Sequence, residues 1–210
     1  MPKVRLLKKH QQRKRKKNNP LIYTFVGLGN PGIEYSRSRH NIGFQVIDFL
    51  ADKLNISLKK KLFANYMFGK GRYEEKEVFL IKPLTYMNRS GTVIHKVLRF
   101  TKTVMRNFVV ICDHLDLPPG VCRFKKMGSS GGQKGLQSII DFLQNDDFPR
   151  IFIGIGRPRK GESIPEYVLR PVTEEESAQF SSAVKTAGES LLLLMKTGPE
   201  KVMNELNRKK

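Results

Sequence analysis

The segment 27–41 carries the clearest potential for acid–base chemistry in this sequence. A glycine-containing turn, Gly-Leu-Gly-Asn-Pro-Gly, follows an apolar run and supplies Asn30, and Tyr35 and His40 come next along the chain. A neutral imidazole such as that of His40 can take a proton from water near pH 7. The segment therefore offers a candidate general base close to an amide. A histidine with a purely structural role is the alternative.

Two further segments, 82–91 and 112–120, place polar side chains where strands are expected to end. Asn88 follows the first of these strands, and Asp113 follows the second. Ligands of α/β proteins bind at the carboxyl ends of strands, so Asn88 could face a ligand or could simply cap the next helix. A carboxylate such as that of Asp113 can orient an imidazole and stabilise its charged form. Turn formation before the Pro-Pro-Gly sequence is the alternative role for Asp113.

The segment 123–135 combines basic residues with a flexible loop. Arg123 and Lys125 lie on a short predicted strand, and a loop of Gly and Ser follows and leads through Lys134 into a helix. Backbone N–H groups in such a loop suit a phosphate or another anion. Arg157 adds positive charge after the last predicted strand.

The sequence lacks the motifs of several common kinds of catalytic, nucleotide-binding and metal-binding site. Gly27, Gly29 and Gly32 match the G-x-G-x-x-G spacing of dinucleotide-binding folds, but the expected helix starts only near residue 41, so its N-terminus cannot face a pyrophosphate in the usual way. That class is kept as a minor alternative. The sequence has no G-x-S-x-G elbow, Walker loop or HExxH motif. Two cysteines, Cys112 and Cys122, do not make a disulfide scaffold or a structural zinc site.

Charge is the unusual property of the composition. The 210 residues carry a net charge of +20, and the first twenty contribute nine Lys or Arg and no acid, so the remainder carries +20 minus 9, or +11. A basic body predicts a polyanionic partner, most often nucleic acid. Residues 1–20 are expected to form a disordered basic arm that grips phosphates, or else a solubilising tail, ahead of a domain over 21–210. No apolar run approaches the ~18 residues of a membrane span, and we expect a cytoplasmic protein, with organellar targeting left open.

Hydrophobic patterning predicts strands that alternate with helices, as in a layered α/β fold. The expected strands are 21–28, 66–69, 78–81, 108–112, 121–125 and 151–155, and the expected helices are 44–54, 91–100, 136–143, 174–194 and 199–206. No internal repeat is present.

Five sequence blocks follow one another in the order VGLGNPGIEYSRSRHNIGF, KPLTYMNRSG, CDHLDLPPG, RFKKMGSSGGQKGLQSII and RIFIGIGRP. In this order and spacing they resemble the bacterial-type peptidyl-tRNA hydrolase family, and the similarity extends from residue 21 to the C-terminus. The resemblance implies a single three-layer α/β domain with a mixed, twisted sheet between helices. It also implies a monomeric esterase that cleaves the bond between a peptide and the terminal ribose of tRNA, with no metal or organic cofactor.

The resemblance also implies roles for individual residues. The histidine matching His40 would be the catalytic base, and the aspartate matching Asp113 would hold it. Asparagines matching Asn30 and Asn88 would bind the peptide end and place the ester, with Tyr35 and Met87 near the same cleft. An amide donor from either asparagine could stabilise the oxyanion.

The sequence departs from the family pattern at two places. The family's loop usually reads Gly-His-Asn-Gly, but here the middle residues are Gln133 and Lys134, and a lysine cannot accept a hydrogen bond as an amide can. Lys134 could bind phosphate or stabilise negative charge instead. Phe152 occupies a position where arginine is common, so tRNA phosphate contacts are assigned to other basic side chains, namely Arg123, Lys125, Arg150 and Arg157. A non-catalytic or weakly catalytic RNA-binding relative of the family is the alternative function.

Overall fold

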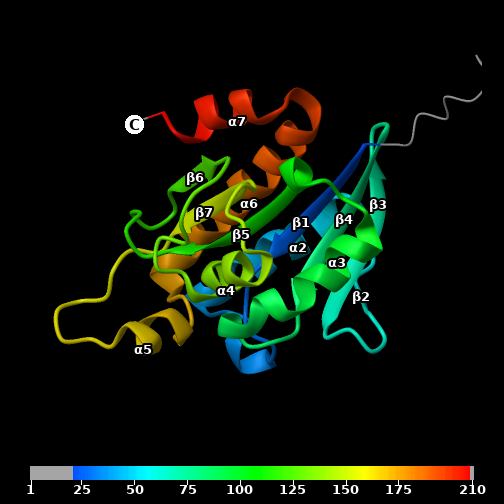
Figure 1. Cartoon of the computed structure of the whole chain (residues 1–210). Coiled ribbons are helices and arrows are strands. Elements are labelled where there is room, and N and C mark those ends of the chain that lie inside the picture. Colours follow the sequence, from blue (N-terminus) through cyan, green and yellow to red (C-terminus); the bar gives the residue numbers. More distant parts are fainter. Residues whose placement is uncertain (1–20, 209–210) are drawn as a thin grey trace, which may run out of the picture.

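The computed structural model describes residues 21–208, and the arm predicted over residues 1–20 lies outside that range. The described chain forms one seven-stranded mixed sheet in the order β2-β3-β4-β1-β5-β7-β6 (Figure 1). The central strands β4, β1, β5 and β7 are parallel, and β2, β3 and β6 are antiparallel to their neighbours. The strands are β1 (Ile22–Gly27), β2 (Lys59–Lys60), β3 (Tyr66–Tyr73), β4 (Lys76–Pro83), β5 (Phe108–His114), β6 (Cys122–Lys125) and β7 (Arg150–Gly154).

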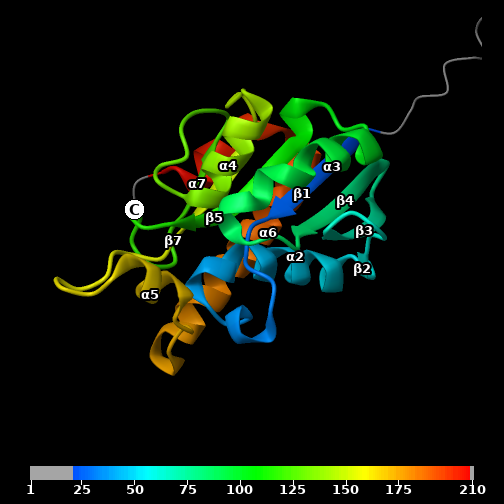
Figure 2. The same cartoon turned by 60° about the horizontal axis from the view of Figure 1, so that its bottom comes forward.

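Helices cover both faces of the sheet and make a three-layer α/β domain, which confirms the predicted fold class. Figure 2 shows α3 and α4 on one side and α2 and α6 on the other. The helices are α2 (Ile42–Lys53), α3 (Ile94–Thr101), α4 (Lys134–Leu143), α5 (Ile164–Leu169), α6 (Glu174–Thr197) and α7 (Pro199–Leu206). None of these helices is both long and apolar enough to cross a membrane.

Alternating side chains on the central strands explain the two layers of core. In β1, Phe25 belongs to the cluster formed with α2 and α6, whereas Val26 belongs to the cluster formed with α3 and α4. Successive strand residues point to opposite faces, so an uninterrupted apolar run is what a strand covered on both faces requires. This is why the continuous apolar pattern of 21–28 and 108–112 predicts central strands correctly.

The predicted strands and helices are all present, and the structure adds one strand, one α-helix and the 3₁₀ turns η1 (Ile33–Tyr35), η2 (Arg39–Asn41) and η4 (Met105–Asn107). The short strand β2 and the helix α5 were not predicted, because two lysines and a six-residue helix give no clear periodicity. The predicted helix 91–100 is divided into a 3₁₀ helix η3 (Met87–Val93) and α3. Gly91 packs so closely on α4 that a Cβ there would lie 2.0 Å from the Ser138 carbonyl oxygen.

Close backbone packing places the start of α2 directly over the ends of β1 and β5. A Cβ on Gly27 would lie 2.1 Å from the carbonyl oxygen of Gly43, and a Cβ on Gly43 would lie 2.4 Å from that of Ile111. Only glycine permits this approach. The 3₁₀ turn η2 (Arg39–Asn41), which immediately precedes α2, is therefore held above the carboxyl edge of the parallel strands.

Candidate active site

A cavity of about 520 Å³ opens at the carboxyl edge of the parallel strands. Its lining includes all seven residues predicted to act in catalysis or substrate binding: Asn30, Tyr35, His40, Met87, Asn88, Asp113 and Lys134. These residues come from segments up to about a hundred positions apart. They meet because the carboxyl ends of parallel strands share one edge of the sheet.

His40 and Asp113 form a hydrogen-bonded pair among the residues that line this cavity. The Nδ1 atom of His40 lies 2.9 Å from Oδ2 of Asp113, which is 3% exposed at the end of β5. When Nδ1–H donates to the carboxylate, the other ring nitrogen, Nε2, is left with its lone pair. The pair therefore has the arrangement of a general base and the group that orients it.

Burial and charge act in opposite directions on the pKa of His40. Burial lowers this pKa, while the charge of Asp113 and its hydrogen bond raise it, and the charge of Lys134 lowers it again. The net pKa lies above the ordinary value for histidine, so the contribution of Asp113 is decisive. A base of raised pKa is a stronger proton acceptor, but its neutral form is lost at a higher pH than for an ordinary histidine.

Gln133 also binds Asp113, a role that sequence reasoning missed. Its Nε2 atom donates to Oδ1 of Asp113 at 3.0 Å, while its Oε1 accepts from the backbone N–H of Leu136 at 2.7 Å and so caps α4. One side chain thus fixes both the second carboxylate oxygen and the start of a helix. Glutamine is not a preferred N-cap residue, and only the departure from the family's loop sequence marked this position.

Asn30 has a structural partner that could not be read from the sequence. Its Oδ1 atom accepts a hydrogen bond from the backbone N–H of Met87 at 2.7 Å, and so joins the glycine turn to η3. Asn41 closes the turn from the other side, because its side chain bonds both the N–H and the C=O of Asn30 at 2.8 and 2.9 Å. Within residues 21–208 the Nδ2 atom of Asn30 makes no hydrogen bond, so it is free to donate.

Of the two roles considered for Asn88, the helix cap is not what the structure shows. Asn88 lies inside η3, whose N-cap is Tyr86, and its exposed side chain makes no hydrogen bond within the described chain. Met87 is buried beside it, and its sulfur lies 3.2 Å from Nε2 of Gln133. Asn88 therefore stands on the cavity wall with its donor and acceptor groups available to a ligand.

The phosphate contact predicted for Arg150 is also wrong. This side chain is fully buried at the start of β7, where it donates to the carbonyl oxygens of Phe148 at 3.0 Å, Asp146 at 2.8 Å and Gly128. Burying an arginine is tolerable only when its donors are satisfied in this way. Arg150 fixes the loop that leads to Lys134 and is not accessible to tRNA.

The other three predicted phosphate-binding residues are accessible. Arg123 and Lys125 alternate outward on the edge strand β6. Arg157 is exposed and donates through Nε to Asp116 at 2.5 Å, a contact that lowers the pKa of that carboxyl group. Their role toward tRNA stays a prediction.

A sequence model of the peptidyl-tRNA hydrolase family matches residues 24–210. A peptidyl-tRNA hydrolase of Thermodesulfovibrio yellowstonii is 45% identical over 189 residues, which are 89% of this chain and 100% of that protein. The chain belongs to the peptidyl-tRNA hydrolase family. One from Geobacillus kaustophilus is also 45% identical, over 87% of this chain and 98% of its own length.

Structural comparison agrees with this assignment. The crystal structure of a peptidyl-tRNA hydrolase from Acinetobacter baumannii matches with a TM-score of 0.84 and 36% identity, and the match covers 90% of this chain and 96% of that one. The enzyme class predicted from the sequence is confirmed, and the alternative of a non-catalytic relative gains no support. In the described chain no group of three or more His, Cys, Asp or Glu residues is arranged to hold a metal ion.

Proposed function

We propose that this protein hydrolyses the ester bond between a peptide and the terminal ribose of tRNA with a water molecule that His40 activates. The observation that carries the proposal is the hydrogen-bonded pair of His40 and Asp113 in a cavity that also holds the amide groups of Asn30 and Asn88. Family membership supports the choice of substrate.

The proposed reaction has two steps, and His40 acts in both. In the first, Nε2 of His40 takes a proton from water while the oxygen bonds to the ester carbonyl carbon, and Asp113 stabilises the imidazolium. In the second, the tetrahedral intermediate releases the ribose oxygen, which takes the proton back from His40. An ester is more reactive toward water than an amide, so the scheme uses activated water and no covalent nucleophile on the enzyme.

Donors in the cavity are proposed to stabilise the oxyanion of the intermediate. The Nδ2 groups of Asn30 and Asn88 and the ammonium group of Lys134 all belong to residues that line the cavity. A well-placed donor of this kind contributes ~3 kcal/mol to transition-state stability. Lys134 carries a full charge where the family usually has an amide, so it stabilises negative charge although it cannot accept a hydrogen bond.

The peptide and the tRNA are proposed to occupy opposite sides of the reacting ester. Apolar side chains of α5 suit the peptide, and the exposed Arg123, Lys125 and Arg157 suit tRNA phosphates. We expect the protein to act as a monomer, with no metal or cofactor, in the cytoplasm or in an organelle that translates.

The direct test is release of N-acetylated amino acids from tRNA by the purified full-length protein, with EDTA present. We expect multiple turnovers that EDTA does not reduce. Tight binding of tRNA without turnover would contradict the proposed activity, and turnover that EDTA abolishes would contradict the metal-free mechanism.

Replacing Lys134 by alanine should move the acid limb of the pH–rate profile to higher pH. The charge of Lys134 lowers the pKa of His40, so its removal lets that pKa rise further above the ordinary value. Neutral His40 is then available only at higher pH. The measurement is kcat/KM against pH, with Lys126→Ala as the control because Lys126 is an exposed lysine that pairs with Glu200 and lies outside the cavity. A limb that stays in place, or moves to lower pH, would show that Lys134 does not act on His40 in this way.

A further inference from the structure

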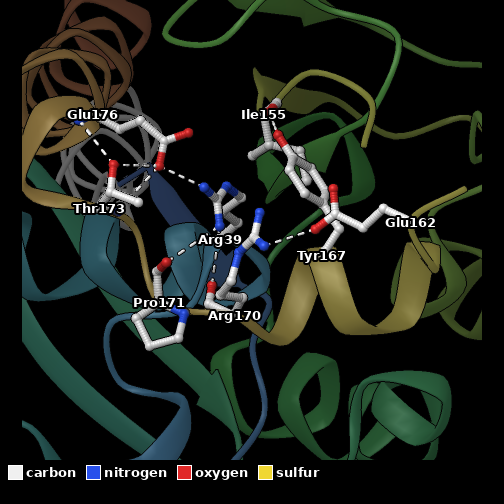
Figure 3. Close-up of polar contacts among 8 residues, drawn as sticks. All are labelled: Arg39, Ile155, Glu162, Tyr167, Arg170, Pro171, Thr173 and Glu176. Carbon is white, nitrogen blue, oxygen red and sulfur yellow. Dashed lines mark hydrogen bonds and ion pairs between the residues drawn. The ribbon is translucent and has the colours of Figure 1, made fainter. Parts of the chain in front are cut away.

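Arg39, the residue before His40, extends its side chain away from the cavity into the segment that joins α5 to α6. Its side chain is 1% exposed although arginine is rarely buried. Figure 3 shows it among residues 155–176, more than a hundred positions away in the sequence. Its burial calls for a physical reason because a buried charge without partners is strongly unfavourable.

The guanidinium of Arg39 has hydrogen-bond partners in the segment after α5 and in the first turn of α6. Nη1 donates to the carbonyl oxygens of Arg170 at 3.3 Å and Pro171 at 3.2 Å, just after α5. Nη2 donates to Oε2 of Glu176 at 2.5 Å, in the first turn of α6. Glu176 also completes the capping box with Thr173, so the same carboxylate caps the N-terminus of α6 and balances the charge of Arg39.

The contact with Arg39 also acts on the pKa of Glu176. Burial acts to raise this pKa, but the hydrogen bonds from Arg39 and Thr173 outweigh it and the net pKa is lowered. Glu176 is therefore charged whenever the protein is near neutral pH, and the contact with Arg39 is a charge-assisted hydrogen bond.

Tyr167 connects the same guanidinium to the body of the domain. The Cζ atom of Arg39 lies 4.6 Å from the centre of the Tyr167 ring, and the tyrosine hydroxyl donates to the carbonyl oxygen of Ile155 at 2.5 Å (Figure 3). Such stacking favours arginine over lysine, because the guanidinium is planar. Tyr167 belongs to α5, so Arg39 and the hydroxyl contact together hold this short helix in place.

The opposite side of α5 forms part of the cavity. Ile164, Pro165, Val168 and Leu169 line it, and we call these four residues the α5 wall. A helix of six residues has little stability of its own, so its position depends on tertiary contacts. Arg39 supplies several of these contacts from the same 3₁₀ turn that carries His40. A backbone hydrogen bond from Val172 N–H to the carbonyl oxygen of Arg37, 2.9 Å long, reinforces the link.

We propose that Arg39 is a positioning residue that sets the distance between the α5 wall and the His40–Asp113 pair, and so determines how well the enzyme accepts an apolar side chain at the C-terminus of the peptide. This inference rests on the proposed function, because it assumes that the peptide lies against the α5 wall. Arg39 itself touches no reacting atom. Its effect is therefore on substrate binding, and it should discriminate between substrates by the size of that side chain.

The test compares N-acetyl-leucyl-tRNA with N-acetyl-glycyl-tRNA for the wild type and the Arg39→Gln variant. If the α5 wall is displaced, the leucine side chain of the substrate loses its apolar contacts with it. KM for the leucyl substrate should therefore rise about tenfold. KM for the glycyl substrate, which has no side chain, should change little, and kcat should be retained for both. Amide hydrogen exchange over residues 164–172 should become faster in the variant.

The matched control is Arg170→Gln. Arg170 is a second arginine beside Tyr167, with its Cζ atom 5.7 Å from the centre of the ring. Its Nη1 atom pairs with Oε1 of Glu162 at 2.8 Å, but its side chain is half exposed. It should leave the ratio of the two KM values unchanged. Arg39→Lys keeps the charge opposite Glu176 but cannot reproduce the full set of contacts, so it should shift KM in the same direction by less. This second variant serves if Arg39→Gln does not fold.

Two results would overturn the inference. Equal changes in KM for the two substrates would show that the α5 wall does not contact the substrate's side chain. Loss of kcat alone would show that Arg39 acts only on η2, the turn that carries His40. Failure of the proposed function is distinguishable, because the wild-type protein would then release neither amino acid.

Discussion

Replacing His40 by alanine should lower kcat for peptidyl-tRNA hydrolysis about 10²- to 10⁴-fold, the usual contribution of a general base. Without the imidazole no group in the cavity is placed by Asp113 to take a proton from water. Affinity for tRNA should be retained, since the exposed basic residues lie elsewhere. Single-turnover rates and a filter-binding titration measure the two effects separately.

His95→Ala is the matched control for this prediction. His95 is exposed on α3, where its ring stacks on Phe142 at 5.4 Å, and it does not line the cavity. It should leave kcat unchanged. Hydrolysis that persists at the wild-type rate without His40 would refute the proposed mechanism, and loss of tRNA binding together with hydrolysis would point to a structural role for His40.

Replacing Asp113 by asparagine should have the second largest effect, a loss of roughly 10²- to 10⁴-fold in kcat, by analogy with other orienting carboxylates. The carboxylate accepts from His40 on one oxygen and from Gln133 on the other. An amide has only one oxygen, so at least one of these two donors must lose its acceptor. The ring of His40 is then free to adopt the wrong tautomer or orientation.

The same substitution should move the remaining activity to lower pH. The charge and hydrogen bond of Asp113 are what raise the pKa of His40, while burial and Lys134 lower it. Without the carboxylate the lowering effects are unopposed, so the pKa of His40 falls and its neutral form persists to lower pH. Residual kcat/KM measured against pH should therefore show an acid limb below that of the wild type.

Asp146→Asn is the control for the Asp113 experiment. Asp146 is an exposed aspartate whose backbone carbonyl, and not its side chain, binds Arg150. Its substitution should change neither the rate nor the profile. An acid limb that moves to higher pH in Asp113→Asn would show that the carboxylate is not the group that holds His40.

Much of the fold follows from local patterns. The continuous apolar runs at 21–28 and 108–112 can be buried on both faces only as central strands, and these are β1 and β5. The short helix α5 escapes such reasoning, because six residues that begin with Ile-Pro show no periodicity. Its Tyr167 contacts Arg39 and Ile155 from other parts of the chain, and these contacts fix its position.

The sequence by itself determined which side chains reach the catalytic edge. His40, Asp113 and Asn88 each come after a predicted strand, and ligands of α/β proteins bind at the carboxyl ends of strands. The family blocks then supplied the expected roles of these residues, and the comparisons confirmed the family.

Only the tertiary structure decided what each polar side chain binds. Arg150 and Arg157 look equivalent in the sequence, yet one is buried among backbone carbonyls and the other is exposed. Gln133 binds Asp113 twenty positions away, and Arg39 binds Glu176 at a separation of 137. A hydrogen bond depends on the direction and distance of two groups. For groups far apart in the chain, these are set by the packing of helices on the sheet, which no local pattern encodes.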